Sequence, residues 1–311
     1  MRSKLLVVGT IAYDTIKTPY AKVERILGGS ATHIALASSM FNLDCSIISI
    51  VGNDFEKKHL DLLREKGINV SGISISKKGK TFHWSGEYFS DMKTRKTIDT
   101  QLNVLEEFEP KVVKELSSPD FLVLANLHPE IQISALNQIK NRPRLIVLDT
   151  MNFWIENFPS PLKKIISMVD VISINDEEAL MLTGENSIIK AVNKIIKMGP
   201  KFVIVKEGDK GASFFDNSQS FFVPSFSVKE VIDPTGAGDS FIGGFVGYLA
   251  EQDQILVETI KKGMIHACAM GSFIVEKFGC ENLINLSTES IKLRVKTIKE
   301  LTNFEPNNIK N

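Results

Sequence analysis

The stretches FLVLAN (residues 121–126) and RLIVLDT (144–150) decide the fold class of this chain. Each is an apolar run rich in Leu, Val and Ile, and a helix-like segment lies between them. Such runs are typical of strands whose two faces are both covered, as in a parallel sheet. The pattern recurs at KLLVVG (4–9), CSIISIVG (45–52), DVISIN (170–175) and KFVIVKEG (201–208). We therefore predict an α/β fold with a doubly wound, mostly parallel sheet.

In sheets of this kind, ligands bind beyond the carboxyl ends of the strands. The residues that directly follow the apolar runs are therefore the first candidates for a site. They occupy positions 10–14, 52–54, 126, 149–152, 175–178 and 206–211.

Two segments interrupt the alternation. Residues 80–101, KTFHWSGEYFSDMKTRKTIDTQ, are rich in aromatic residues and Thr and predict a hairpin with its turn at 90–93. A second polar segment, 11–27, follows the first strand. Because a lone hairpin is only marginally stable in water, we expect the two segments to pair into one small sheet. This sheet would form a lid on a single domain of residues 1–311, and it is also the candidate contact of a homodimer.

The charge balance and the cysteines limit which kinds of partner and which cellular compartment are expected. Lys and Arg number 37, as do Asp and Glu, so no net field attracts nucleic acid or an anionic membrane. A small neutral or anionic ligand is favoured. Cys45, Cys268 and Cys280 share no C-x-x-C spacing and predict free core thiols in a reducing compartment. No apolar run reaches the ~20 residues of a spanning helix, and we expect a cytoplasmic protein.

The stretch VIDPTGAGDSFIGGF (231–245) predicts an anion site. Pro234 is expected to end a strand, and the three small residues after Thr235 let the backbone turn tightly before an apolar, buried helix. The unpaired N–H groups and the positive dipole end of that helix would face a ligand beside Asp239. The alternative is that Asp239 only caps its own helix. Rigid donors beside a carboxylate favour phosphoryl transfer.

Other site patterns fit less well. No G-x-x-x-x-G-K-[ST] loop occurs, and G-x-G-x-x-G fails at Phe241. GDSF resembles the start of GDS-type esterases, with Ser240 as nucleophile, but the last histidine, His266, has no Asp three residues before it. The five histidines show no metal-ligand spacing.

Taken together, the motifs resemble those of the ribokinase-like (PfkB) family of sugar and nucleoside kinases. DPTGAGDSFIGGF (233–245) is similar to the C-terminal signature of the family. GGSATHIA (28–35) and IVGNDF (50–55) resemble its N-terminal signature, and NDEEA (175–179) resembles its N-x-x-E motif. The resemblance covers nearly the whole chain. It implies transfer of the γ-phosphate of ATP to a hydroxymethyl group, with Mg2+, across a site closed by a β-lid.

For the transfer step, the resemblance implies roles at matching positions. Asp239 matches the catalytic base, and the backbone of Gly236, Ala237 and Gly238 matches the anion hole. Asp233 matches a position that often helps to hold a monovalent cation such as K+.

The resemblance also assigns the ATP and Mg2+ positions. Asn175 and Glu178 match the motif that organises Mg2+ and phosphates, with Glu178 acting through water because Mg2+ releases its waters reluctantly. The alternative is a helix N-cap followed by a solvated carboxylate. Three residues match the family's positions at the strand end that binds the nucleotide: Lys206, Gly208 and Gly211.

On the acceptor side, Asp14, Gly28 and Gly29 match sugar-binding positions, where a carboxylate can accept from two neighbouring hydroxyls. The alternative for Asp14 is a turn residue that closes the first strand. His33 stands where many sugar kinases have Asn within G-G-x-x-x-N, which leaves the substrate open. Trp84 of the hairpin could stack on a nucleobase or a sugar, and packing within the lid is its alternative.

These expectations describe an ATP-dependent kinase that phosphorylates a primary hydroxyl of a sugar or sugar-containing compound. One alternative is a nucleoside kinase, and a more distant one is a catalytically silent protein that binds a metabolite. The intact GAGD and N-x-x-E stretches favour the enzyme, because a binding protein would need no base.

Overall fold

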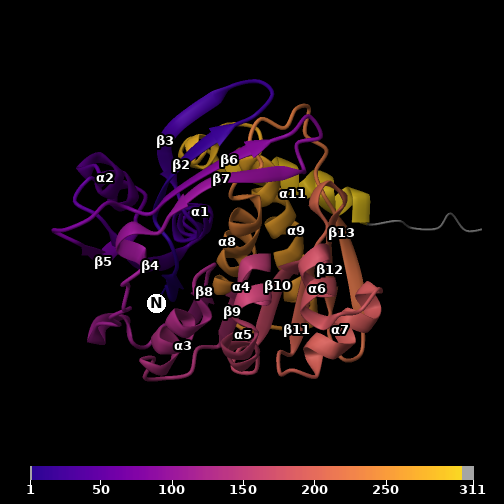
Figure 1. Cartoon of the computed structure of the whole chain (residues 1–311). Helices are drawn as coiled ribbons and strands as arrows, with labels where there is room; N and C mark the ends of the chain where they lie inside the picture. The colour runs from indigo at the N-terminus through magenta and orange to yellow at the C-terminus, as the bar shows by residue number, and fades with distance from the viewer. Residues whose placement is uncertain (1, 303–311) are drawn as a thin grey trace, which may run out of the picture.

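The computed structural model describes residues 2–302. Residue 1 and residues 303–311, which the expected domain of residues 1–311 includes, lie outside the described range. Strands and helices alternate along most of the described chain, as Figure 1 shows.

The central sheet has nine strands in the order β13-β12-β11-β10-β9-β8-β1-β4-β5. The strands from β11 to β5 in this order are parallel, and β12 and β13 are antiparallel. The predicted mostly parallel sheet is thus confirmed. In chain order its strands are β1 (Ser3–Val8), β4 (Leu43–Val51), β5 (Asn69–Ile75), β8 (Phe121–Leu124), β9 (Leu145–Asp149), β10 (Val171–Asn175), β11 (Phe202–Lys206), β12 (Gly211–Phe215) and β13 (Ser220–Pro224).

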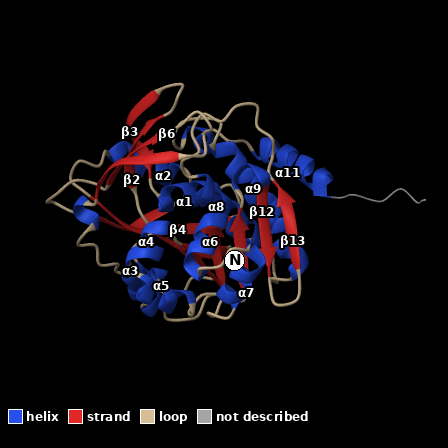
Figure 2. Cartoon of the chain, turned by 45° about the vertical axis from the view of Figure 1, so that its right-hand side comes forward, coloured by secondary structure: helices blue, strands red, loops and turns tan. Residues whose placement is uncertain are grey.

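Helices cover both faces of this sheet, as Figure 2 shows. Successive side chains of β1 point to opposite faces, so Leu5 and Val7 join one buried cluster while Leu6 and Val8 join the other. The first face is covered by α1 (Ser30–Ser38), α2 (Lys57–Glu65), α8 (Ala237–Ala250), α9 (Val257–Ile274), α10 (Glu281–Ile284) and α11 (Thr288–Thr302). The second is covered by α3 (Pro129–Asn137), α4 (Asn152–Asn157), α5 (Pro159–Ile166), α6 (Asp176–Thr183) and α7 (Ile188–Ile196). The doubly wound architecture is therefore confirmed.

A second, smaller sheet has the order β3-β2-β6-β7 and lies at the top of Figure 1. Its strands are β2 (Ala12–Lys17), β3 (Lys22–Gly28), β6 (His83–Tyr88) and β7 (Arg95–Gln101). Each hairpin is antiparallel, and the parallel pair β2–β6 joins them. The two segments that interrupt the sequence pattern thus form one sheet, as predicted. It packs on the main body where Ile16, Tyr88 and Met92 contact Val231 and Phe278.

One local expectation is wrong, because no strand ends at Pro234. β13 already ends at Pro224, and a loop leads from there to α8. The N–H groups of Ile232 and Asp233 donate to the carbonyl of Val275 at 2.7 and 3.2 Å, so this segment is held by the end of α9 rather than by a neighbouring strand.

The three cysteines are buried and free, as expected of core thiols. Within residues 2–302, no helix combines the length and the apolar character needed to cross a membrane.

Candidate active site

The turn before α8 presents backbone N–H groups beside Asp239. Gly236 is the N-cap of α8 and has a left-handed conformation, with φ of 78°. A Cβ atom added at Gly236 would lie 2.6 Å from the His33 ring, so only glycine allows this close approach. Among the described residues, no side chain caps α8, and the alternative that Asp239 caps its own helix is not supported.

Asp239 is half-buried at the start of α8. Burial and the negative charge of Asp149 raise the pKa of Asp239 to about 7, while the positive charges of Lys206 and Arg95 lower it. The carboxyl group can therefore take up or release a proton near neutral pH.

Asp14 of β2 lies near Asp239 although it comes from the other end of the chain. Its side chain is 5% exposed, and burial raises its pKa to about 8, with further contributions from the negative charges of Asp233 and Asp239. An added Cβ at Gly28 would lie 1.9 Å from Asp14 Oδ2, so glycine at position 28 makes room for this carboxyl group. The structure thus brings together Asp14, Gly28 and the α8 turn.

Asp233 stabilises this turn through two hydrogen bonds. Its Oδ1 accepts from the N–H of Thr235 and its Oδ2 from the N–H of Gly279, both at 2.9 Å. The carboxyl group is buried, which raises its pKa. Asp233 therefore ties the turn before α8 to the loop that follows α9.

Asn175 and Glu178 form a capping box at the start of α6. Asn175 Oδ1 accepts from the N–H of Glu178 at 2.7 Å, and Glu178 Oε2 accepts from the N–H of Asn175 at 3.0 Å. The structural alternative for this pair is thus present, but the Glu178 carboxylate is half-buried rather than solvated, and burial raises its pKa. Its other oxygen, Oε1, is not needed for the cap.

Lys206, at the end of β11, forms an ion pair with Asp149, at the end of β9, with 2.9 Å between Nζ and Oδ1. Burial lowers the pKa of Lys206, but the carboxylates of Asp149 and Glu178 outweigh burial and raise it. An added Cβ at Gly238 would lie 3.2 Å from Nζ. The ammonium group therefore adjoins both the α8 turn and the start of α6.

The two glycines after β11 differ in what they do. Gly208 has φ of 60° and open space where a Cβ would stand. Gly211 has φ of 135°, and a Cβ there would lie 2.1 Å from the carbonyl oxygen of Val223 on β13. Close strand pairing thus accounts for Gly211, while Gly208 leaves its surroundings open.

His33 and Trp84 both pack against other parts of the protein. His33 is 1% exposed, its Nδ1 lies 3.0 Å from the carbonyl oxygen of Gly29, and burial lowers its pKa to about 4. The neutral ring therefore keeps its proton on Nδ1, and its Nε2 has no partner among the described residues. Trp84 belongs to the cluster that seats the small sheet, which agrees with its packing alternative.

Sequence reasoning missed two charged residues near Asp239. Asp149 was only one of several residues that follow strands, and nothing local indicates its ion pair with Lys206. Arg95 lies on the hairpin, where the pattern indicates only an exposed strand. Its positive charge lowers the pKa of both Asp239 and Glu178.

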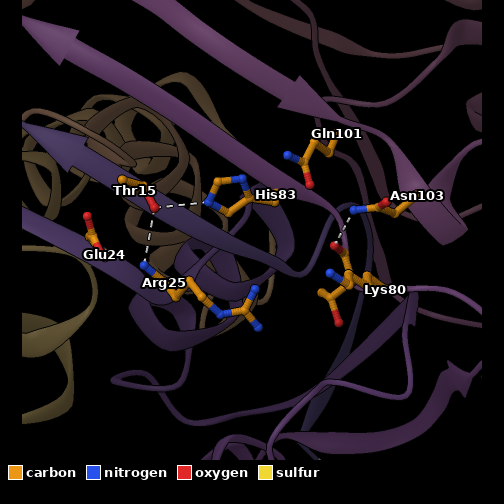
Figure 3. Close-up of a pocket in the computed structure, with 8 residues that line it drawn as sticks. Thr15, Glu24, Arg25, Lys80, His83, Gln101 and Asn103 are labelled. Carbon is orange, nitrogen blue, oxygen red and sulfur yellow. Dashed lines mark hydrogen bonds between the residues drawn. The ribbon is translucent and has the colours of Figure 1, made fainter.

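A cavity of about 300 Å³ lies elsewhere, on the opposite side of the small sheet, and Figure 3 shows residues that line it. Thr15 Oγ1 and His83 Nε2 are 2.9 Å apart there. Because successive residues of β2 point to opposite faces, Thr15 faces away from Asp14. This cavity is therefore separate from the carboxylate site.

Comparisons with known proteins show what the chain is similar to. The profile of the pfkB family of carbohydrate kinases matches residues 2–286. The cytidine kinase of Thermococcus kodakarensis is 28% identical over 270 residues, covering 85% of this chain and 94% of that protein. Among solved structures, the nucleoside kinase of Burkholderia thailandensis in complex with inosine has a TM-score of 0.79 at 19% identity. The match covers 97% of this chain and 100% of that chain. An E. coli protein assigned as ribokinase II, in complex with ATP and Mg2+, has a TM-score of 0.79 at 22% identity, covering 95% of this chain and 99% of that one.

Proposed function

Because the chain belongs to the pfkB family of carbohydrate kinases, we propose that it transfers the γ-phosphate of ATP to a primary hydroxyl of a sugar or sugar-containing compound. The observation that carries the proposal is Asp239, whose pKa is raised to about 7 beside an uncapped helix start. A titratable carboxyl next to the backbone donors of this turn suits the acceptor hydroxyl on one side and the transferred phosphoryl group on the other.

Asp239 accepts the proton of the attacking hydroxyl. A base with a pKa near the working pH combines a useful ionised fraction with enough basicity to take the proton. Asp14 holds the acceptor by accepting hydrogen bonds from its other hydroxyls, and the glycines at 28 and 29 leave space for the ring. His33 supports the turn through its contact with Gly236.

The N–H groups of Gly236, Ala237 and Gly238, with the ammonium group of Lys206, receive the charge that develops on the phosphoryl oxygens. The N–H of Ala237 also donates to the carbonyl of Pro234 at 3.2 Å, so it is shared between the two acceptors. Phosphoryl transfer gives a protein little covalent work, so this positioning supplies most of the acceleration. Gly208 lets the nucleotide approach the backbone after β11.

The residues present fit a water-coordinated Mg2+. Among residues 2–302, no three His, Cys, Asp or Glu side chains lie close enough together to hold a metal ion by themselves. Oε2 of Glu178 is used by the capping box, so Oε1 is the oxygen of this residue that can contact a hydrated ion. Mg2+ commonly keeps several waters and binds through phosphates and one or two carboxylates. When bound with ATP, Mg2+ neutralises charge on the phosphate oxygens. K+, if used, would bind near Asp233, mainly through the backbone carbonyls of the loops that Asp233 joins.

Conversion of Asp239 to Asn tests the base. We expect kcat to fall by roughly 10²–10⁴ while the affinity for ATP changes little, because the amide keeps the shape but cannot take the proton. In the unaltered protein, kcat/KM should fall about tenfold per pH unit below pH 7, since the base is then protonated. Turnover of Asp239→Asn close to that of the unaltered protein would contradict the assignment.

A nucleoside is the second candidate acceptor. The cytidine kinase relative and the inosine-bound structure support it, and a nucleoside is itself a sugar-containing compound. ADP release should therefore be measured across pentoses, hexoses, sugar phosphates and nucleosides. A response to nucleosides alone would favour the second candidate, and no response to any acceptor would contradict the proposed function.

We also propose that the protein acts in the cytoplasm and that two copies associate through the small sheet. The buried free thiols support a reducing compartment. Every residue of β7 is exposed, and Ile98 is 54% exposed, which leaves this strand available to a second copy. Light scattering of the purified protein would show a dimer or rule it out.

A further inference from the structure

Arg95 lies on the inner face of the small sheet. In the β6–β7 hairpin it pairs directly with Tyr88, so the two side chains lie on the same face. Tyr88 is 4% exposed, and its hydroxyl oxygen lies 3.2 Å from Thr235 Oγ1. Because Thr235 directly precedes Gly236, this contact sets Arg95 beside the turn at the start of α8.

Trp84 lies along the same face and flanks Arg95. An added Cβ at Gly86 would lie 2.2 Å from the Trp84 ring, so the indole covers the backbone of β6 between Trp84 and Tyr88. The guanidinium carbon of Arg95 is 5.8 Å from the centre of this ring. The indole thus borders the guanidinium group on the inner face of the small sheet, opposite the outer-face cavity of Figure 3.

The charge of Arg95 acts on two carboxylates from different elements. It lowers the pKa of Asp239, at the start of α8, and of Glu178, at the start of α6. Yet Arg95 is exposed, and it takes part in none of the ion pairs between residues 2 and 302. Lys206, the other cation here, is already paired with Asp149. Arg95 is therefore the cation near these two carboxylates whose charge remains available to a ligand.

We infer that Arg95 binds the γ-phosphoryl group of ATP during its transfer. This rests on the proposed function, in which phosphate passes from the side of Glu178 and Lys206 to the side of Asp239. A guanidinium group can donate two parallel hydrogen bonds to phosphate oxygens. Since the turn and Lys206 lie on the main body, Arg95 supplies a donor from the small sheet, and the sheet must be seated for transfer.

The test compares Arg95→Ala and Arg95→Lys with Lys96→Ala. Lys96 is the next residue on β7, is exposed and faces the other side of the sheet, opposite Glu87. Arg95→Ala should lower kcat by roughly 10²–10³, and Arg95→Lys should lose less because it keeps the charge but not the paired donors. Added guanidinium ion should restore part of the lost kcat in Arg95→Ala, and it should not raise kcat in Arg95→Lys or Lys96→Ala. Lys96→Ala should stay within about twofold of the unaltered protein.

Calorimetry makes the inference independent of the acceptor. Arg95→Ala should bind ATP about tenfold more weakly and ADP as the unaltered protein does, because only ATP carries the γ-phosphoryl group. An unchanged ratio of ATP to ADP affinity, or a kcat equal to that of Lys96→Ala, would overturn the inference. If the unaltered protein turned over no acceptor, the proposed function would fail, while the affinity ratio would still decide the role of Arg95. Melting temperatures of all variants check that they fold.

Discussion

Burial dominates the ionisation of Asp14 and Asp239. Both pKa values are raised, to about 8 and about 7, first by burial and then by neighbouring carboxylates. Between pH 4 and 8 the folded protein therefore retains protons that the unfolded chain has lost. Stability falls with rising pH wherever the folded state binds more protons. Burying these two carboxyl groups therefore lowers the stability of the folded protein near neutral pH.

Asp14→Asn should stabilise the ligand-free protein at pH 8 but not at pH 4. The amide resembles the protonated carboxyl, so it removes the loss of stability that builds up between the unfolded pKa near 4 and the folded pKa near 8. The gain is at most about 5 kcal/mol, since one pKa unit corresponds to about 1.4 kcal/mol. Thermal unfolding from pH 4 to 8 measures it.

The exposed Asp44 of β4 provides the control, because Asp44→Asn removes a carboxylate that is not buried. A gain for Asp14→Asn that is equal at both pH values would mean that packing rather than ionisation causes it.

At the scale of elements, α6 combines a structural cap with a proposed metal contact. One oxygen of Glu178 completes the capping box with Asn175, and the other is not needed for the cap. A glutamine can still accept the hydrogen bond from the N–H of Asn175, but it has no negative charge for a hydrated Mg2+. The two roles can therefore be separated by one substitution.

Glu178→Gln should raise the Mg2+ concentration needed for half-maximal activity, by about threefold to tenfold. Its effect on the free energy of unfolding should stay below about 1 kcal/mol, because the cap hydrogen bond can persist. A magnesium titration and a urea unfolding curve measure the two effects. The neighbouring exposed Glu177, changed to Gln, is the matched control. Overlapping magnesium titrations for the two variants would restrict Glu178 to its cap.

At the scale of the whole molecule, the small sheet contacts the main body through an apolar cluster of its own and through ion pairs and hydrogen bonds. Ile16, Tyr88 and Met92 pack with Val231 and Phe278, and Lys93 Nζ lies 2.8 Å from Asp209 Oδ2. The ion pair is exposed and contributes little. The apolar cluster therefore carries much of this contact, together with Leu27 of β3, which belongs to the buried cluster on the first face of the central sheet.

Ile16→Ala should loosen the small sheet selectively. Removing a fully buried side chain creates a cavity that typically costs about 2–5 kcal/mol. Hydrogen exchange should accelerate at least about tenfold in β2, β3, β6 and β7 while β1, β8 and β9 keep their protection. Ile98→Ala, in the same sheet but exposed, should change neither group. Equal acceleration in both sheets would show that they open as one unit.

Sequence reasoning reached the architecture because its signals are local. Apolar runs such as 121–124 and 145–149 predict strands covered on both faces, and those strands lie side by side in the central sheet. The hairpin at 80–101 and its partner segment are set by turns and polar residues close together in the chain. The expected strand before Pro234 failed because the end of α9, distant in sequence, supplies its hydrogen-bond acceptor.

By itself, the sequence determined the doubly wound sheet, the second small sheet, the glycine turn before Asp239 and the pairing of Asn175 with Glu178. The sequence signal for each lies in residues within a few positions of one another, so hydrophobic pattern and turn chemistry suffice to predict it. Only the tertiary structure decided that Lys206 meets Asp149 across β10, 57 residues away, and that Arg95 acts on Asp239. It also decided that Asp14 is held mainly protonated at pH 7. Ion pairs and pKa values depend on burial and on distances between charges, and both arise only when distant segments pack together.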